Sequence, residues 1–217
     1  MASSLSHPDF DLMFLPPDSW VEIAVDPARR SVQIAALMKT VQKIFPNTGN
    51  SYAALSRSVE AMFAEAWGAG VRYAIMPRIR VDGTINMLAF FTVAVIPAAS
   101  PDGDTDTQRN EIYRSLVKER EQFLDGEFSE ITTAENTSLG KGVQAASVEY
   151  MQTKKGKDIS RKISLFRAFF PVMDQTIVAT GTCFQEEYRD ILFRMFGLMA
   201  STLSVEPVER GGKVSDE

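Results

Sequence analysis

The alternation of hydrophobic and polar residues is clearest between residues 71 and 97. Two strand-like runs, Arg72 to Val81 and Thr84 to Ile96, are joined at Asp82-Gly83. This dipeptide between alternating runs is the strongest short-range signal of a β-hairpin. The pattern therefore predicts two neighbouring antiparallel strands.

The length of the loop decides which side chains share a face, because a shift of one residue moves every side chain to the opposite face. A two-residue loop, Asp82-Gly83, scatters apolar residues over both faces. A three-residue loop, Val81-Asp82-Gly83, with the glycine in a bulge, gathers them on one. We therefore predict the bulged loop, with this apolar face: Tyr73, Ile75, Ile79, Ile85, Met87, Ala89, Phe91 and Val93.

Apolar residues recur at helical spacing in four other segments. We expect helices over about 27–45, 52–67, 107–124 and 185–203. The first begins at Asp26-Pro27, a capping acid followed by proline at the first helical position. The apolar stripe of the second is Leu55, Val59, Met62, Phe63 and Ala66; that of the third is Ile112, Tyr113, Leu116, Val117, Phe123 and Leu124.

Further strands are expected at 21–25, 126–137, 143–153, 162–172 and 176–183. Short turns between successive strands build antiparallel pairs, whereas a parallel sheet needs a helix between strands. We therefore predict an α+β fold with an antiparallel sheet of about six to seven strands packed against helices, similar to an α/β/α sandwich. Residues 13–205 form the single domain, and residues 1–12 and 206–217 are expected to be flexible tails.

Composition narrows the possible environments and partners. The 217 residues carry a net charge of −5 with 45% hydrophobic residues, as in an ordinary globular protein. The acidic balance argues against a nucleic-acid binder. The longest apolar stretch, 87–99, is too short to span a membrane. Cys183 is the only cysteine and no signal peptide is visible, so we expect a cytoplasmic protein without a disulfide.

Catalytic groups are sparse. His7 is the only histidine and lies in the expected tail, so Ser-His-Asp, Cys-His and His-rich zinc chemistry lack their histidine. Cys183 is expected to be a buried hydrophobe at a strand end, Gly140-Lys141-Gly142 a turn rather than a phosphate loop, and Asn136-Thr137-Ser138 a chance glycosylation pattern. No catalytic residue, metal or cofactor is assigned, and whether the protein is an enzyme stays open, with a non-enzyme favoured.

Two basic clusters are candidate contact sites for a partner. Arg72, Arg78 and Arg80 lie near the end of the first hairpin, and Lys154, Lys155 and Lys157 lie at the tip of a later one. Arginine is enriched at protein interfaces, although such residues also occur on solvated faces. Phe166, Phe169 and Phe170 can line a ligand cavity, but packing between sheet and helices explains them more simply.

The two ends of the chain resemble a known fold group. Pro16-Pro17-Asp18-Ser19-Trp20 precedes a strand, and the strand 176–181 runs into a helix that ends at 200–205. These features look like the PsbP-like α/β/α sandwich group, which includes photosystem subunits, nuclear-import Mog proteins and actinobacterial LpqN-type lipoproteins. The chain departs from the group by two helices after its first strand and by lacking a lipoprotein signal. The resemblance implies a binding or accessory role and transfers no site residue.

Two functions are compatible with these observations. The first is a non-catalytic cytoplasmic binding or accessory protein that acts through contact with another protein. The alternative is a small-molecule-binding protein, or an enzyme that works without histidine, with an aromatic-lined pocket. Neither nucleic-acid binding nor membrane insertion is expected.

Overall fold

The computed structural model describes residues 10–44, 51–78, 88–120, 129–151 and 161–207. Its centre is a seven-stranded, fully antiparallel sheet. In spatial order the strands are β2 (Trp20–Glu22), β3 (Val71–Pro77), β4 (Ala89–Pro97), β8 (Gln175–Cys183), β7 (Arg161–Val172), β6 (Gly140–Met151) and β5 (Ser129–Asn136). The predicted α+β fold with an antiparallel sheet is confirmed.

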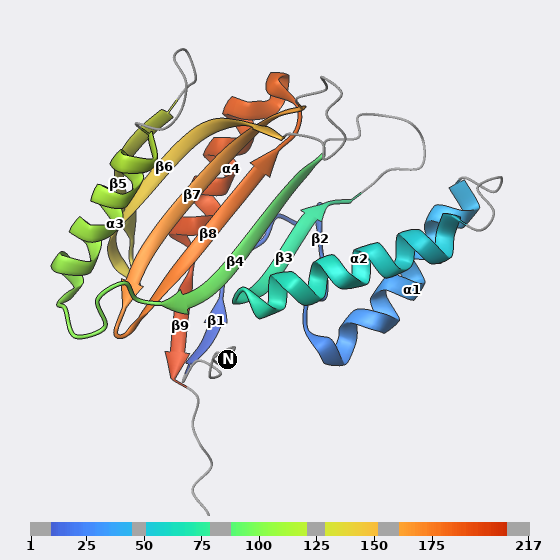
Figure 1. Ribbon diagram of the computed structural model, residues 1–217, viewed down its shortest axis with the longest axis horizontal. Coiled ribbons are helices and arrows are strands. Elements are labelled where there is room, and N and C mark those ends of the chain that lie inside the picture. The colour runs from blue at the N-terminus through green and yellow to red at the C-terminus, as the bar shows by residue number, and fades with distance from the viewer. Residues whose placement is uncertain (1–9, 45–50, 79–87, 121–128, 152–160, 208–217) are drawn as a thin grey trace, which may run out of the picture.

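Helices lie on both faces of this sheet (Figure 1). On one face, α4 (Arg189–Ser201), preceded by a 3₁₀ turn at Glu186–Tyr188, crosses the central strands. On the other, α3 (Thr105–Arg120) covers the β5–β6 end and α2 (Ser51–Gly68) packs on β3 at the opposite end. The remaining helix, α1 (Pro27–Ile44), packs beside α2.

Aromatic rings form the centre of the core beneath α4. Phe196 stacks on Phe91 at 5.8 Å between ring centroids and contacts Phe166 at 6.0 Å. Gly181 makes room for it, because a Cβ at that position would lie 2.2 Å from the Phe196 ring. All three phenylalanines are buried, and Phe91 belongs to the apolar face predicted for the first hairpin.

The register of the first hairpin confirms the part of the predicted apolar face that the structure describes, whereas Ile79, Ile85 and Met87 lie outside the described residues. Tyr73 pairs with Val93 and Ile75 with Phe91, so these four side chains share one face. A three-residue loop with no further irregularity in the strands would pair Ile75 with Ala89. The observed pairing of Ile75 with Phe91 is shifted by two residues from that register. The loop itself falls within 79–87, outside the described residues.

Residues 10–12 and 206–207 lie in strands, whereas the sequence placed them in the tails. β1 (Phe10–Met13) pairs with β9 (Ser204–Pro207) in a separate two-stranded sheet. Phe10 and Leu12 are buried and alternate with two exposed residues. Four residues of alternation were too few to stand out in the sequence, and the partner strand is almost 200 residues away along the chain.

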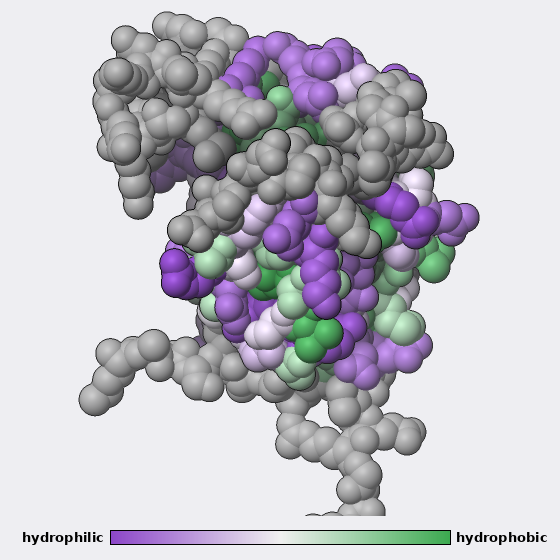
Figure 2. Space-filling model, turned by 90° about the vertical axis from the view of Figure 1, so that its right-hand side faces the viewer, coloured by the Kyte–Doolittle hydropathy of each residue, from purple (hydrophilic) through white to green (hydrophobic). Residues whose placement is uncertain are grey.

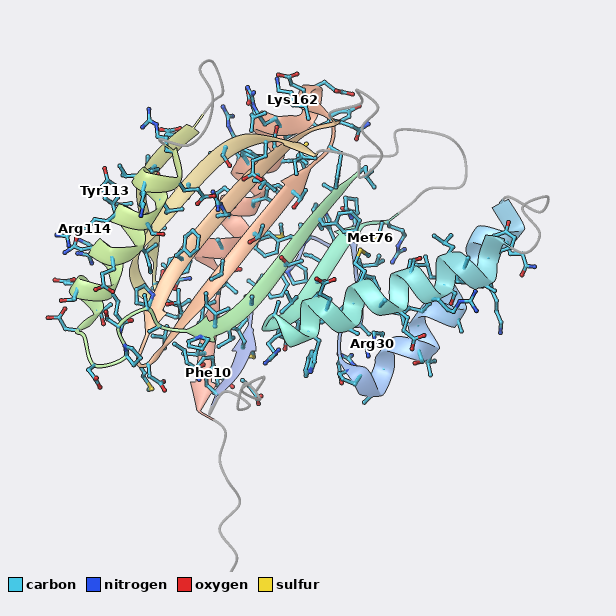
Figure 3. The ribbon with its side chains drawn as sticks, in the orientation of Figure 1. Phe10, Arg30, Met76, Tyr113, Arg114 and Lys162 are labelled. Atoms are coloured by element: carbon cyan, nitrogen blue, oxygen red, sulfur yellow. The ribbon has the colours of Figure 1, made fainter. Side chains whose placement is uncertain are left out.

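The α3 helix differs from its predicted pattern. It begins at Thr105, just after Asp104. The Asp104 side chain accepts a hydrogen bond from the Thr107 amide at 2.7 Å, and this bond lowers the pKa of Asp104. Leu116 is buried against β6, but Tyr113, which the predicted stripe included, is 48% exposed and points away from the sheet (Figure 3). The buried polar residue is Gln108, whose amide donates to the carbonyls of Gly103 and Met173.

The β5–β6 turn holds the end of α4 through Asn136. The buried Asn136 amide group donates to the carbonyl oxygens of Ala200, Ser201 and Leu203, at 2.9 to 3.1 Å. Its side-chain oxygen accepts from the amides of Ser138 and Leu139, both at 2.7 Å. Asn136 is therefore a structural clamp between a turn and a helix terminus, and its side chain is not presented as a glycan acceptor.

The glycine–lysine cluster, for which the sequence predicted a turn, forms the first three residues of β6, directly after the turn at 137–139. Gly140 has a positive φ of 80°, which a residue with a side chain adopts at a cost. Gly142 lies so close to the neighbouring strand that a Cβ there would sit 2.2 Å from the Phe169 carbonyl oxygen. Both glycines are explained by backbone geometry.

Candidate functional site

Among the α-helices that the structure describes, α1 and α2, which form a helical hairpin, are the least covered by the rest of the chain. Each helix has 18 residues, and the pair extends away from the β2–β3 edge of the sheet (Figure 1). Among the side chains described in these two helices, Ile34 alone is buried. The hairpin therefore presents most of its surface to the surroundings.

The N-terminus of α1 is anchored to the sheet edge. Asp26 caps the helix, its side chain accepting from the Ala28 amide at 2.9 Å. The Gln33 amide group donates to the Glu22 carbonyl at 2.7 Å, and its oxygen accepts from the Ala24 amide. These bonds hold the start of α1 to the chain that follows β2.

The C-terminal end of α2 is the part that packs on the sheet. Phe63 and Trp67 contact a small cluster whose buried members are Ile23, Val25 and Ala74. Between the two helices, the Ser31 hydroxyl donates to the Glu60 carboxylate at 3.1 Å. The hairpin is thus attached at its sheet-proximal end and by contacts between its own helices.

The apolar stripe predicted for α2 is only partly covered by the rest of the domain. Phe63 packs against the sheet, whereas Leu55 is 44% and Met62 is 55% exposed. Leu55 and Met62 are seven residues apart and so lie on the same side of the helix. On α1, Val32 is 75% exposed. The periodicity correctly predicted a helix here but not how much of its stripe the domain covers.

The side of the molecule where α1 and α2 lie has a mixed surface. Figure 2 shows hydrophobic residues interspersed with hydrophilic ones there. Met76, from β3, is half-buried and lies beside α2 (Figure 3). We define the candidate site, the hairpin surface, as Val32 of α1 with Leu55 and Met62 of α2.

Arg72, one of the predicted contact residues, is turned inward at the end of α2. Its guanidinium lies 4.5 Å from the centre of the Trp67 ring and donates to the Trp67 carbonyl at 3.1 Å. A cation at this position is favourable at the negative end of the helix dipole. Burial lowers the pKa of Arg72. Its role in the structure is to hold α2 on β3.

The other predicted basic residues are not brought together with Arg72. Arg78 is exposed, and its amide donates to the Ser19 carbonyl at 2.9 Å. Arg78 is six positions along the chain from Arg72, a distance of about 20 Å at the usual rise per residue of a strand. Arg80, Lys154, Lys155 and Lys157 lie outside the described residues.

The aromatic residues considered for a ligand cavity are occupied in packing. Phe166 and Phe170 are buried in the core under α4, and Phe166 contacts the rings of Phe193 and Phe196. Phe169, on the opposite face, packs against the cluster of Leu116, Val143 and Ala145 beneath α3. The arrangement matches the simpler of the two sequence interpretations.

Cys183 is buried at the end of β8, as the sequence predicted. Desolvation raises the pKa of its thiol, and the sulfur lies 3.0 Å from the Gln185 carbonyl as a donor. A thiol that holds its proton is a poor nucleophile. Within the part of the chain that the structure describes, no group of three or more His, Cys, Asp or Glu side chains is arranged to hold a metal ion.

The helices of the described segments include none with the length and apolar character needed to cross a membrane. Comparisons with known proteins give little more. No family model and no curated protein matches the chain.

Among solved structures, the chain is similar to the Ran-binding protein Mog1p of Saccharomyces cerevisiae. The match has 8% sequence identity and a TM-score of 0.34, and it covers 60% of this chain and 77% of Mog1p. This is a loose likeness of fold to the Mog group, and it says nothing about the partners of this chain.

Proposed function

We propose that this protein is a non-catalytic accessory protein that binds another protein through the hairpin surface. The observation that carries the proposal is the burial of a single described side chain, Ile34, in two helices of 18 residues each. Helices in globular proteins normally owe their stability to an apolar face packed on a core. Here part of that face, Leu55 and Met62, stays in contact with water.

A partner that covers this surface would gain binding free energy from apolar burial. Fully burying a leucine or methionine side chain contributes about 1.5–3 kcal/mol. The anchored N-terminus of α1 and the Arg72–Trp67 contact at the end of α2 hold the hairpin in place, so little ordering is needed upon binding. Arg78 is exposed at the end of β3 and remains a candidate contact with the partner. Arg72 instead donates to the Trp67 carbonyl and holds the end of α2 on β3.

We also propose a cytoplasmic location. The support is the single cysteine, which is buried as a thiol and so needs no oxidising compartment.

Affinity enrichment with a matched pair of variants tests the proposed function. Leu55→Ser/Met62→Ser removes two exposed apolar side chains seven residues apart on α2. Ile191→Ser/Leu198→Ser removes two with the same spacing on α4, where Ile191 is 65% and Leu198 is 69% exposed. Each serine change leaves the net charge unaltered, and exposed substitutions are expected to change the free energy of unfolding by about 0.5 kcal/mol or less.

The expected result is a partner, enriched in stoichiometric amount by the wild-type chain, whose affinity falls about tenfold or more in the α2 variant and less than twofold in the α4 variant. The affinities are measured by calorimetry with the purified partner. Retention of that partner by the α2 variant, or the absence of any stoichiometric partner, would overturn the proposal.

A further inference from the structure

Positive charge is concentrated in the α1–α2 hairpin. Residues 27–68 contain five lysines and arginines and two glutamates, which gives a net charge of +3. Because the whole chain has a net charge of −5, the remaining residues together carry −8. The α1 helix itself contains four basic residues and no acidic one: Arg29, Arg30, Lys39 and Lys43.

Several of these residues share the outer face of α1. Arg29, Val32, Ala36 and Lys39 follow one another at intervals of three and four residues, the spacing of one helix face. Ile34, the buried residue of α1, lies on the opposite side, since two residues turn a helix by about 200°. Arg29, Val32, Ala36 and Lys39 are exposed.

The two basic residues described on this face differ in whether they form ion pairs with other residues of the chain. Arg29 forms an ion pair with Glu22 at 2.9 Å and lies 3.5 Å from Asp26. Lys39 forms no ion pair with the residues that the structure describes. Lys39 is therefore the position at which the positive charge of the outer face can be tested.

We propose that the outer face of α1 docks on an acidic surface of the partner protein, with Val32 as its apolar contact. The proposal deepens the proposed function by naming the chemistry of the partner, and it rests on the same hairpin being the binding element. Complementary charge steers association and selects among partners, while the exposed valine contributes apolar burial.

A protein surface fits this face better than a lipid or nucleic-acid surface. A helix that lies in a membrane interface needs a broad apolar face with bulky side chains. The outer face of α1 offers Val32 as its single large apolar side chain. Nucleic-acid-binding domains usually carry a surplus of basic residues, whereas this chain has a net charge of −5.

The test uses fluorescein-labelled poly-L-glutamate, long enough to span the length of α1, which is about 27 Å. Fluorescence anisotropy measures its affinity for the full-length protein, for Lys39→Glu and for Lys118→Glu. Lys118 is an exposed lysine in the last turn of α3, so both variants make the same change of charge in the chain. Poly-L-lysine, a double-stranded DNA oligonucleotide and phosphatidylserine vesicles are the comparison probes.

Saturable binding of poly-L-glutamate is expected, weakened about tenfold between 20 and 200 mM salt because exposed charges are screened. Lys39→Glu should weaken it at least fivefold and Lys118→Glu less than twofold. Equal effects of the two variants, absence of binding, or tighter binding to DNA or to the vesicles would overturn the inference.

The two proposals can fail separately. Loss of the stoichiometric partner in Leu55→Ser/Met62→Ser, together with unchanged binding of that partner and of poly-L-glutamate by Lys39→Glu, would sustain the proposed function and refute the acidic partner surface.

Discussion

Two regions of this protein carry the same kind of helical pattern but pack very differently. The 13-residue α4 buries four side chains under the sheet: Leu192, Phe196, Met199 and Ala200. The α1–α2 hairpin, with 18 residues in each helix, buries Ile34 alone among its described side chains. The difference arises from position, because α4 crosses the middle of the sheet whereas α1 and α2 extend past its edge (Figure 1).

The comparison indicates which region contributes most to the stability of the fold and which leaves apolar side chains exposed. A side chain surrounded by core residues contributes its full apolar burial to the free energy of unfolding. An exposed side chain contributes little to the free energy of unfolding. Its apolar surface remains available for burial against a binding partner. The predictions below measure this contrast with matched substitutions in the two regions.

The largest effect is expected from shortening a phenylalanine in each region. Phe196→Ala should lower the free energy of unfolding by about 3–5 kcal/mol, because it leaves a cavity among the rings of Trp20, Phe91 and Phe166. Phe63 of α2 is half-buried, so Phe63→Ala should lower the free energy of unfolding by about 1–2 kcal/mol. Urea denaturation followed by circular dichroism measures both values. Equal losses would contradict the contrast between the regions.

Two glycine-to-alanine substitutions should change the free energy of unfolding in different ways, one lowering it and the other leaving it unchanged or raising it. Gly181→Ala should cost about 3 kcal/mol, because the new Cβ meets the Phe196 ring at 2.2 Å and the packed core cannot yield freely. Gly68→Ala should be neutral or stabilise by up to about 1 kcal/mol, since nothing lies within 4 Å of its Cβ position and alanine favours a helix. Thermal unfolding of both variants under one condition gives the comparison. Stability retained in Gly181→Ala would show that Phe196 can move aside.

A smaller difference is expected between the two side chains that hold helix ends. Asn136→Ala removes the donors to three carbonyl oxygens at the end of α4 and should cost about 2–3 kcal/mol, because buried polar groups lose their partners. Arg72→Ala at the end of α2 should cost about 1 kcal/mol, because that site is half-buried and water replaces the lost bonds. Hydrogen exchange of the last turn of each helix reports the local effect. An Arg72 variant that loses more than the Asn136 variant would reverse the ranking.

Local patterns predicted most of the elements. The helix over 27–45 and the strand over 176–183 appear as Pro27–Ile44 and Gln175–Cys183. Capping residues, helical spacing and strand alternation are properties of neighbouring residues, so they can be recognised without the fold. The short strand β1 was missed because its alternation spans only four residues and its pairing depends on β9.

The candidate site was not predictable in the same way. The sequence pointed to Arg72 as a contact residue, but the structure places it against Trp67 and the end of α2. Leu55 and Met62 were expected to pack as part of an apolar stripe and are exposed instead. Both outcomes depend on where α2 ends relative to the sheet, which no local pattern contains.

By itself, the sequence determined the class of fold, the order of its elements apart from β1 and β9, and the shortage of histidine and cysteine chemistry, since these follow from composition and from residues close together along the chain. Only the tertiary structure decided which apolar stripe is covered, that Asn136 joins a turn to the end of α4, and that α1 and α2 project from the sheet. The physical reason is that burial is created by residues far apart in the chain. The same amphipathic pattern therefore becomes core in α4 and surface in the hairpin.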